Sequence, residues 1–185
     1  MSTAVVTPSR GVASVDLAHV HEQQLLRTAA FSLKSLLRTD SQARGTGGAP
    51  NQQILLNPML LNLPSIETFI FNITTSLDIK TAVLVTALIY VERLSRRLPE
   101  SATGTVDTPY RIFLASLLLA DKFWSDSAVP VKALVAAAGG VFALREISSM
   151  ERALIKLLGF NLYVSADQIR KHAQRIGFVI PEQPS

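Results

Sequence analysis

The stretch that decides the fold is Pro109–Ser125, which reads PYRIFLASLLLADKFWS. Pro109 suits the first turn of a helix, because its fixed φ is helical and an N–H there would have no partner. Asp107 or Thr108 stands where a capping side chain is expected. The apolar residues that follow surround the helix instead of forming one stripe. Since a soluble helix that is apolar on all sides must be enclosed, we expect a central helix within a ring of amphipathic neighbours.

Four further helices are expected around this one, because helical patterns with clear ends stand before and after it. The first begins after Pro64, with Ser65 as its cap or with Pro64 itself near its first turn. The other three cover about 79–98, the segment from Pro130 to Gly139, and about 144–158. Ser165–Gln168 has capping-box spacing and opens a last helix that runs to Ile176. Strand signals are weak throughout. The sequence therefore predicts an all-α fold, with one five-helix domain around the central helix and additional N- and C-terminal helices.

The chain divides into three parts. Residues 1–51 form an N-terminal segment that we expect to be partly disordered, with one or two short helices over 17–37 and a Gly-rich linker at its end. The helical domain spans 64–164, and residues 165–185 form a C-terminal helix and tail. At 185 residues the chain has room for one domain with a true core. A second five-helix domain would need roughly a hundred more residues.

Composition narrows the class of protein. An apolar content of 48% is enough to fill a core, and a mean hydropathy of +0.30 makes a membrane protein worth testing. The longest apolar-rich run, Thr81–Val91, stops at Glu92 and is shorter than the roughly 20 residues that cross a bilayer. Met1–Ser14 carries no secretory signal, and the sequence has no cysteine. We expect a soluble protein of the nucleus or the cytoplasm.

The net charge of +4 and the pI of about 9.7 permit a nucleic-acid partner without favouring one. Basic residues are scattered along the chain, and the densest group, Arg93, Arg96 and Arg97, has Glu92 beside it. A nucleic-acid site would show a longer, unbroken basic stripe. We therefore expect no nucleic-acid partner.

Catalytic motifs are missing from the sequence. His19 and His21 are two residues apart, so a helix would point them in different directions, and His172 lies on a polar helix. Neither glycine-rich stretch, 45–48 or 139–140, carries the lysine and hydroxyl of a phosphate-binding loop. No Gly-x-Ser-x-Gly elbow occurs. The sequence therefore predicts no catalytic residue, metal, cofactor or small-molecule substrate.

Two charged residues stand in apolar surroundings. Lys122 follows Leu118 by one turn and precedes Phe123 and Trp124, and Glu151 lies at the edge of an apolar stripe. Desolvating a charge is costly unless the charge has a partner. Two interpretations are open. Either the lysine extends its head into water while the glutamate reaches solvent, or the two charges belong to a functional site.

Three segments, in this order and spacing, resemble the cyclin box. Tyr90–Leu94 (YVERL) is similar to the Tyr-Ile-Asp-Arg segment of its second helix. Arg111–Asp126 resembles its central helix, whose end carries a Lys-Phe pair, here Lys122 and Phe123. Glu146–Val164 resembles its fifth helix, with a Met-Glu pair, leucines and a closing Asn-Leu. Within the family the chain most resembles the single-box P/U-type cyclins of fungi and plants, relatives of the phosphate-response cyclin.

The resemblance implies a regulatory subunit that binds and activates a cyclin-dependent protein kinase. Lys122 would donate to carbonyls of the kinase's regulatory helix and Glu151 would accept from its N–H groups, with Phe123 and Trp124 beside them. Held inward, that helix lets its glutamate pair with the ATP-binding lysine. The alternatives are a transcription-factor-like helical core domain that binds DNA and basal factors, and a helical scaffold without a kinase partner.

The sequence departs from the family pattern in three places. Many cyclins pair an arginine of the first helix with the acidic residue of the second, here Glu92, but no arginine occurs between Pro64 and Lys80. That bridge is therefore missing or rebuilt. The arginine-containing substrate-docking motif is absent from Ser65–Ile70, so we expect no substrate docking by that route. Pro130 and the segment after it replace the asparagine and tryptophan usual in P-type cyclins.

Overall fold

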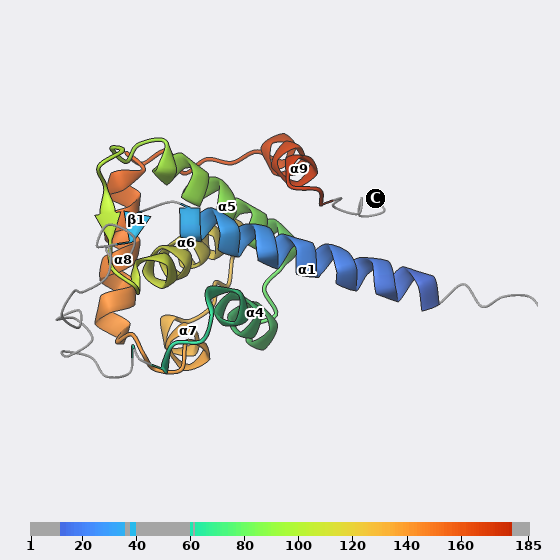
Figure 1. Ribbon diagram of the computed structural model, residues 1–185, viewed down its shortest axis with the longest axis horizontal. Helices are drawn as coiled ribbons and strands as arrows, with labels where there is room; N and C mark the ends of the chain where they lie inside the picture. Colours follow the sequence, from blue (N-terminus) through green and yellow to red (C-terminus); the bar gives the residue numbers. More distant parts are fainter. Residues whose placement is uncertain (1–11, 36–37, 40–59, 61, 179–185) are drawn as a thin grey trace, which may run out of the picture.

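The computed structural model describes residues 12–35, 38–39, 60 and 62–178, with the side chains of 12–22 and 38–39 left out. Helices make up most of this part of the chain (Figure 1). They are α1 (Val12–Ser35), α4 (Ile66–Ser76), α5 (Thr81–Ser95), α6 (Thr108–Trp124), α7 (Val131–Ala137), α8 (Leu144–Leu157) and α9 (Ala166–Arg175). Two strands, β1 (Arg38–Thr39) and β2 (Thr103–Gly104), pair in parallel over two residues. The predicted all-α class is confirmed.

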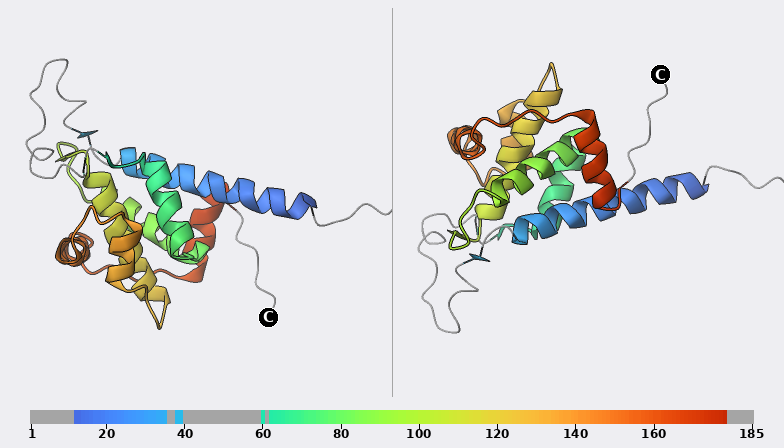
Figure 2. Two further views of the ribbon diagram at one scale, coloured as in Figure 1. Left: turned by 90° about the horizontal axis from the view of Figure 1, so that it is seen from below. Right: turned by 90° about the horizontal axis from the view of Figure 1, so that it is seen from above.

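The central helix of the fold is α6. It packs along α5 and α8 and also touches α1 and α4, as the views of Figures 1 and 2 show. Every residue from Phe113 to Asp121 is buried, which covers all sides of the helix over two turns. The prediction of an enclosed central helix is thus confirmed, with α4–α8 as the five helices of the domain. The last turn, Lys122–Trp124, emerges from the ring and is exposed.

A second helix, α5, is enclosed as well, although the sequence pattern assigned it to the amphipathic neighbours. Every residue from Val83 to Val91 is buried. One side of α5 packs on α6, while α1 and α9, which lie outside the five-helix domain, pack on its other sides (Figure 2). The faces of α1 and α9 are therefore part of the core, through Leu25, Leu26, Ala29, Ala30, Leu33, Ile169 and Ala173.

The N-terminal helix differs from expectation. Where one or two short helices were predicted over 17–37, α1 is one continuous helix that begins earlier, at Val12. It packs on α4 and α5, and Lys34 Nζ lies 2.6 Å from a carboxylate oxygen of Glu67 on α4. The Gly-rich linker before residue 52 lies outside the described residues. The division of the chain into 1–51, 64–164 and 165–185 stays a prediction.

The helix caps agree with the sequence at two ends and differ at a third. Ser65 Oγ accepts the Thr68 N–H at 3.2 Å, and Ser165 and Gln168 exchange both bonds of a capping box. At α6 the predicted proline stands in the first turn, but the Asp107 carboxylate makes no capping bond. It accepts instead from Thr105 Oγ1 and from the guanidinium of Arg111. Asp107 is therefore the N-cap residue, as predicted, but its carboxylate binds the cation of Arg111 instead of an N–H of the helix.

Truncation of the central helix should destabilise the whole domain. Leu118 is buried between α6 and its neighbours, so Leu118→Ala removes packed methyl groups and leaves a cavity. We expect the free energy of unfolding to fall by roughly 2–5 kcal/mol, measured by urea denaturation. The matched control is Leu144→Ala on the exposed first turn of α8, which should cost less than about 1 kcal/mol. Equal losses in the two variants would contradict the enclosure of α6.

Candidate functional site

Lys122 and Glu151 form an ion pair where the central helix emerges from the core. Lys122 lies in the last turn of α6 and Glu151 in α8, and the lysine Nζ lies 2.8 Å from each carboxylate oxygen. The Glu151 side chain is 10% exposed and that of Lys122 is 45% exposed. Glu151 therefore only grazes solvent, and it has a partner in Lys122. Lys122 meets the buried charge and keeps its own outer side open to solvent.

Exposed aromatic side chains continue the surface from Lys122. The rings of Phe123 and Trp124 meet edge-to-face with centroids 5.3 Å apart, and Phe123 meets Tyr163 edge-to-face at 6.3 Å. Trp124 Nε1 donates to Thr86 Oγ1 of α5 at 2.8 Å, which fixes the indole. The structure thus brings together all four residues singled out in the sequence. We call this patch the α6-end surface, and it consists of Lys122, Phe123, Trp124, Glu151 and Tyr163.

Tyr163 was not recognised in the sequence, nor was its neighbour Phe160. Both lie in the linker between α8 and α9 and are 71% and 72% exposed. The available signal was the apolar run directly after Gly159, the residue at which the helix pattern ends. Phe160 follows with a positive φ of 59°, which turns the chain out of the helix. Large apolar side chains that are exposed together are typical of a surface that a partner covers, and Tyr163 extends the ring of Phe123 in this way.

The linker that carries these aromatic residues is hydrogen-bonded to α5. Tyr90 Oη donates to the Leu162 carbonyl at 2.7 Å. The guanidinium of Arg93 donates to the carbonyl of Asn161 at 2.8 Å and to that of Tyr163 at 2.9 Å. Burial raises the pKa of Tyr90 to about 12, so its hydroxyl remains a donor over the whole physiological range. Side chains of α5 therefore hold three successive carbonyls of the linker.

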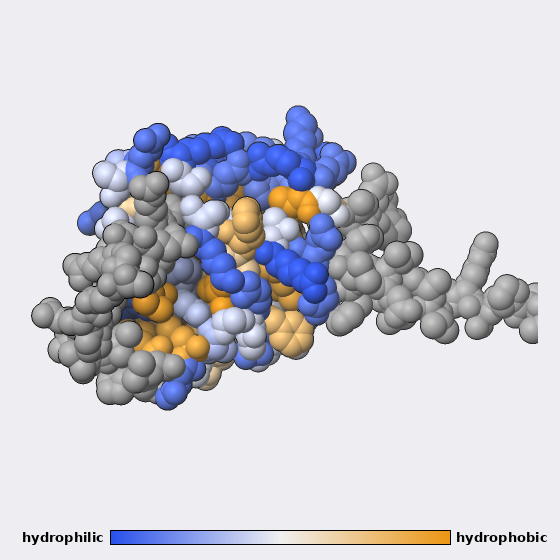
Figure 3. Space-filling model, in the orientation of Figure 1, coloured by the Kyte–Doolittle hydropathy of each residue, from blue (hydrophilic) through white to orange (hydrophobic). Residues whose placement is uncertain are grey.

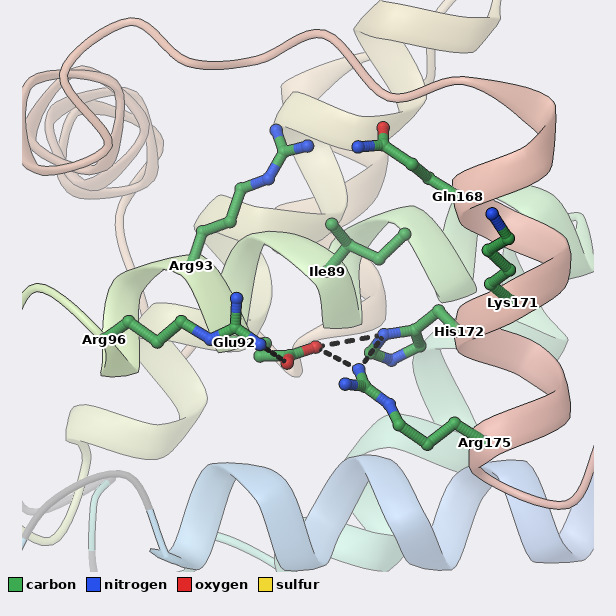
Figure 4. A pocket seen from close by; sticks show the side chains of 8 residues that line it. All are labelled: Ile89, Glu92, Arg93, Arg96, Gln168, Lys171, His172 and Arg175. Carbon is green, nitrogen blue, oxygen red and sulfur yellow. Dashed lines mark hydrogen bonds and ion pairs between the residues drawn. The ribbon is translucent and has the colours of Figure 1, made fainter.

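A hollow between α5 and α9 has Glu92 at its centre (Figure 4). The Glu92 carboxylate accepts from Arg96 on its own chain segment and from Arg175 of α9, and His172 Nδ1 lies 3.1 Å from it. The resemblance led us to expect a bridge to this residue from the first helix that is missing or rebuilt, and here it is rebuilt from α9. Arg175 supplies the cation that the sequence lacks between Pro64 and Lys80.

Four basic side chains line this hollow, and each is bonded to the protein itself. Arg93 donates to the two linker carbonyls, Arg96 and Arg175 to Glu92, and Lys171 pairs with Asp167 at 2.8 Å. Figure 3 shows the hydrophilic surface that these groups help to form along the upper edge of the molecule, over α5 and α9. Because the cations are already paired and a carboxylate sits among them, the hollow joins α9 to α5 and is not a site for an anion.

The ion cluster shifts two pKa values in the same direction. Burial alone would raise the pKa of Glu92, but the hydrogen bond and charge of Arg175, with the charges of Arg96 and His172, hold it below its usual range. Burial lowers the pKa of His172, the charge of Arg175 lowers it further, and the Glu92 carboxylate only partly offsets them. His172 is therefore neutral at pH 7 and Glu92 is ionised.

The described residues form neither a metal site nor a membrane-spanning helix. No three histidine, aspartate and glutamate side chains gather there in a way that could hold a metal ion. None of the helices described has the length and apolar content needed to cross a bilayer. His19 and His21 stand on α1 in the part whose side chains are left out. The expected lack of a metal and a cofactor stays a prediction.

Comparison with known proteins gives one family and several relatives. The model of the cyclin N-terminal domain matches residues 52–163. PHO85 cyclin-1 of Saccharomyces cerevisiae is 40% identical over 110 residues, which is 60% of this chain and 39% of that protein. PHO85 cyclin-9 and PHO85 cyclin-2 of the same yeast are 27% and 28% identical over 57% and 59% of the chain. The chain spans 35% of the length of each of these two.

The His172 environment should make stability fall on acidification. Unfolded His172 takes up a proton near pH 6.5 and folded His172 only at a lower pH, so between these values the unfolded state holds more protons. We expect the midpoint of thermal unfolding to fall between about pH 7 and about pH 5, followed by circular dichroism. His172→Gln should flatten this slope, while Lys171→Gln on the exposed side of α9 should not. An unchanged slope in His172→Gln would contradict the assignment.

Proposed function

The chain belongs to the cyclin family, and from this membership we propose that it is a regulatory subunit that binds and activates a cyclin-dependent protein kinase. Three relatives are named as cyclins of PHO85, so the partner proposed for this chain is a kinase of the PHO85 kind. The matches do not favour the transcription-factor-like alternative. Nucleic acid and small-molecule substrates are not part of the proposal. A location in the nucleus or the cytoplasm, expected from the sequence, stays a prediction.

The observation that carries the proposal is the Lys122–Glu151 pair at the edge of exposed aromatic rings. A partner that covers the α6-end surface would bury Phe123, Trp124 and Tyr163, and aromatic anchors of this kind dominate the binding energy of many interfaces. The ion pair gives the same surface a donor and an acceptor at fixed positions. Apolar burial therefore supplies affinity, and the charged pair supplies register.

The two charges offer complementary bonds to a helix of the kinase. The Lys122 ammonium has three N–H groups, and those not used on Glu151 are free to donate to carbonyls at a helix end. The Glu151 oxygens accept N–H groups of the same kinase segment. Such charge-assisted bonds gain strength when a partner excludes water from them. They would hold the regulatory helix of the kinase inward, so that its glutamate pairs with the ATP-binding lysine.

In this proposal the chain positions the regulatory helix of the kinase, and the kinase active site carries out phosphoryl transfer. The described residues around Lys122 are aromatic rings and one ion pair, which bind a surface and do not activate a nucleophile. Phosphoryl transfer depends on the metal ions, lysine and aspartate of the kinase active site. The chain acts on them indirectly, through the helix that it holds.

Removal of the ion pair should weaken kinase binding. We expect the double variant Lys122→Ala/Glu151→Ala to bind the PHO85 kinase of Saccharomyces cerevisiae at least about tenfold more weakly, because both charge-assisted contacts are lost. The double variant is preferred to either single one, since removing only Lys122 leaves a buried, unpaired carboxylate that destabilises the fold. Binding is measured by titration with purified kinase, and activation by phosphorylation of a peptide substrate.

The matched control is Asp167→Ala/Lys171→Ala on α9. This pair has the same 2.8 Å separation but is exposed, and neither residue belongs to the α6-end surface. It should leave kinase binding unchanged. If the Lys122/Glu151 variant binds as tightly as the original chain, the assigned interface is wrong. If the original chain neither binds nor activates the kinase, the proposed function itself is wrong.

A further inference from the structure

We infer that Arg93 is a positioning residue for the α6-end surface, acting on Tyr163 through the main chain of the linker. The inference deepens the proposed function and rests on it for its partner. Arg93 lies on α5, and its two hydrogen bonds go to the carbonyls of Asn161 and Tyr163. It forms no part of the ion pair or of the aromatic patch. Its effect on a partner must therefore pass through the segment that it holds.

The linker needs such support because it has little regular hydrogen bonding of its own. Between α8 and α9 the chain runs from Leu158 to Ser165 without a helix or strand. Its internal backbone bonds are the Asn161 N–H to the Leu158 carbonyl and the Leu162 N–H to the Phe160 carbonyl. Backbone carbonyls away from water require donors. On the side that faces α5, those donors are supplied by side chains of α5.

Two side chains of α5 and one from the turn that follows it supply these donors. Tyr90 and Arg93 are three residues apart on α5, so they point to the same side of the helix, and Arg97 lies two residues beyond its end. Arg97 Nη1 donates to the Leu157 carbonyl at the end of α8, at 3.1 Å, and Tyr90 holds the carbonyl of Leu162. Arg93 is the one that bonds the residue carrying the exposed ring. It is therefore the donor whose loss would reach Tyr163 most directly.

The held backbone presents its aromatic side chains outward. Phe160 and Tyr163 are largely exposed, while Leu162 between them packs against the core. Tyr163 reaches Phe123 edge-to-face, so the position of its main chain decides whether the aromatic patch is continuous. A surface that is already ordered before binding loses less conformational entropy when the partner arrives. Arg93 thus contributes to affinity by fixing Tyr163 in the free chain.

The geometry requires an arginine and not merely a positive charge. One guanidinium reaches two carbonyls that are two residues apart in sequence, which its planar fork allows. A lysine presents one compact ammonium without this fixed fork, so it would hold the two carbonyls less well. Arg93 also lies over the Tyr90 ring, 5.9 Å from its centroid, so the two donors support each other. Arg93→Lys keeps the charge and separates these two effects.

A double-mutant cycle on kinase affinity tests the inference. With the PHO85 kinase as the probe, Arg93→Ala and Tyr163→Ala should each weaken binding by about tenfold. The combination should bind no more weakly than the worse single variant, because Arg93 acts only through Tyr163. Arg93→Lys should fall between Arg93→Ala and the original chain. Losses that add would mean that Arg93 acts on the partner by itself, and an unaltered affinity of Arg93→Ala would equally overturn the inference.

Arg96→Ala is the matched control. It removes the same positive charge three residues further along the chain. The guanidinium of Arg96 bonds Glu92 and not the linker. It should leave kinase affinity unchanged, and a loss equal to that of Arg93→Ala would assign the effect to charge alone. If Arg93→Ala does not fold by circular dichroism, Arg93→Lys takes its place in the cycle.

Hydrogen exchange on the free chain tests positioning without any kinase. In Arg93→Ala the amides of Asn161 and Leu162 should exchange faster, while those of α5 and α6 keep their protection. Unchanged exchange in the linker would overturn the positioning role even if affinity fell. Faster exchange with no binding of kinase by the original chain would uphold the contact and reject the proposed function. The two failures are therefore distinguishable.

Discussion

Two apolar helices, α5 and α6, lie against each other, and the rest of the fold serves to keep water from both. A helix that is buried on every side has no stable state outside such an enclosure. The five-helix domain encloses α6 between α5, α8 and α4, with a further contact from α1. It leaves the outer side of α5 uncovered, and this side is closed by α1 and α9. The helices before and after the domain are therefore parts of its core.

The same enclosure decides where charges can stand. Three carboxylates next to α6 are buried, and each has a partner: Asp107 with Arg111, Asp121 with Ser125 and the Val129 N–H, and Glu151 with Lys122. The first two partners belong to the segments that begin and end α6, so those pairs fasten the chain locally. Lys122 is different, because its outer side faces solvent beside exposed aromatic rings. Among these pairs it is the one that also offers donors to another molecule.

The sequence was most informative where one local rule decides the outcome. Pro109 and the all-round apolar pattern after it indicated the central helix, and Ser165 with Gln168 indicated the start of α9. It was least informative where partners come from distant segments. No sequence pattern near Glu92 predicts its bond to Arg175 of α9. Tyr163, which is largely exposed, lies in a segment too short to show a periodicity. The burial of α5 was missed for the same reason, since its cover is supplied by α1 and α9.

The C-terminal half of α5 thus anchors everything that follows α8. Tyr90 and Arg93 of α5 hold the linker, Arg97 in the turn after α5 holds the end of α8, and Glu92 on another face of α5 holds α9. In family members that pair this acidic residue with the first helix, the ion pair joins α5 to a helix that precedes it in the sequence. Here the ion pair joins α5 to α9, which follows it. The physical requirement is that a half-buried carboxylate meets a cation, and it does not specify which helix supplies it. Because the cation comes from Arg175 of α9, the C-terminal helix is part of the framework that supports the α6-end surface.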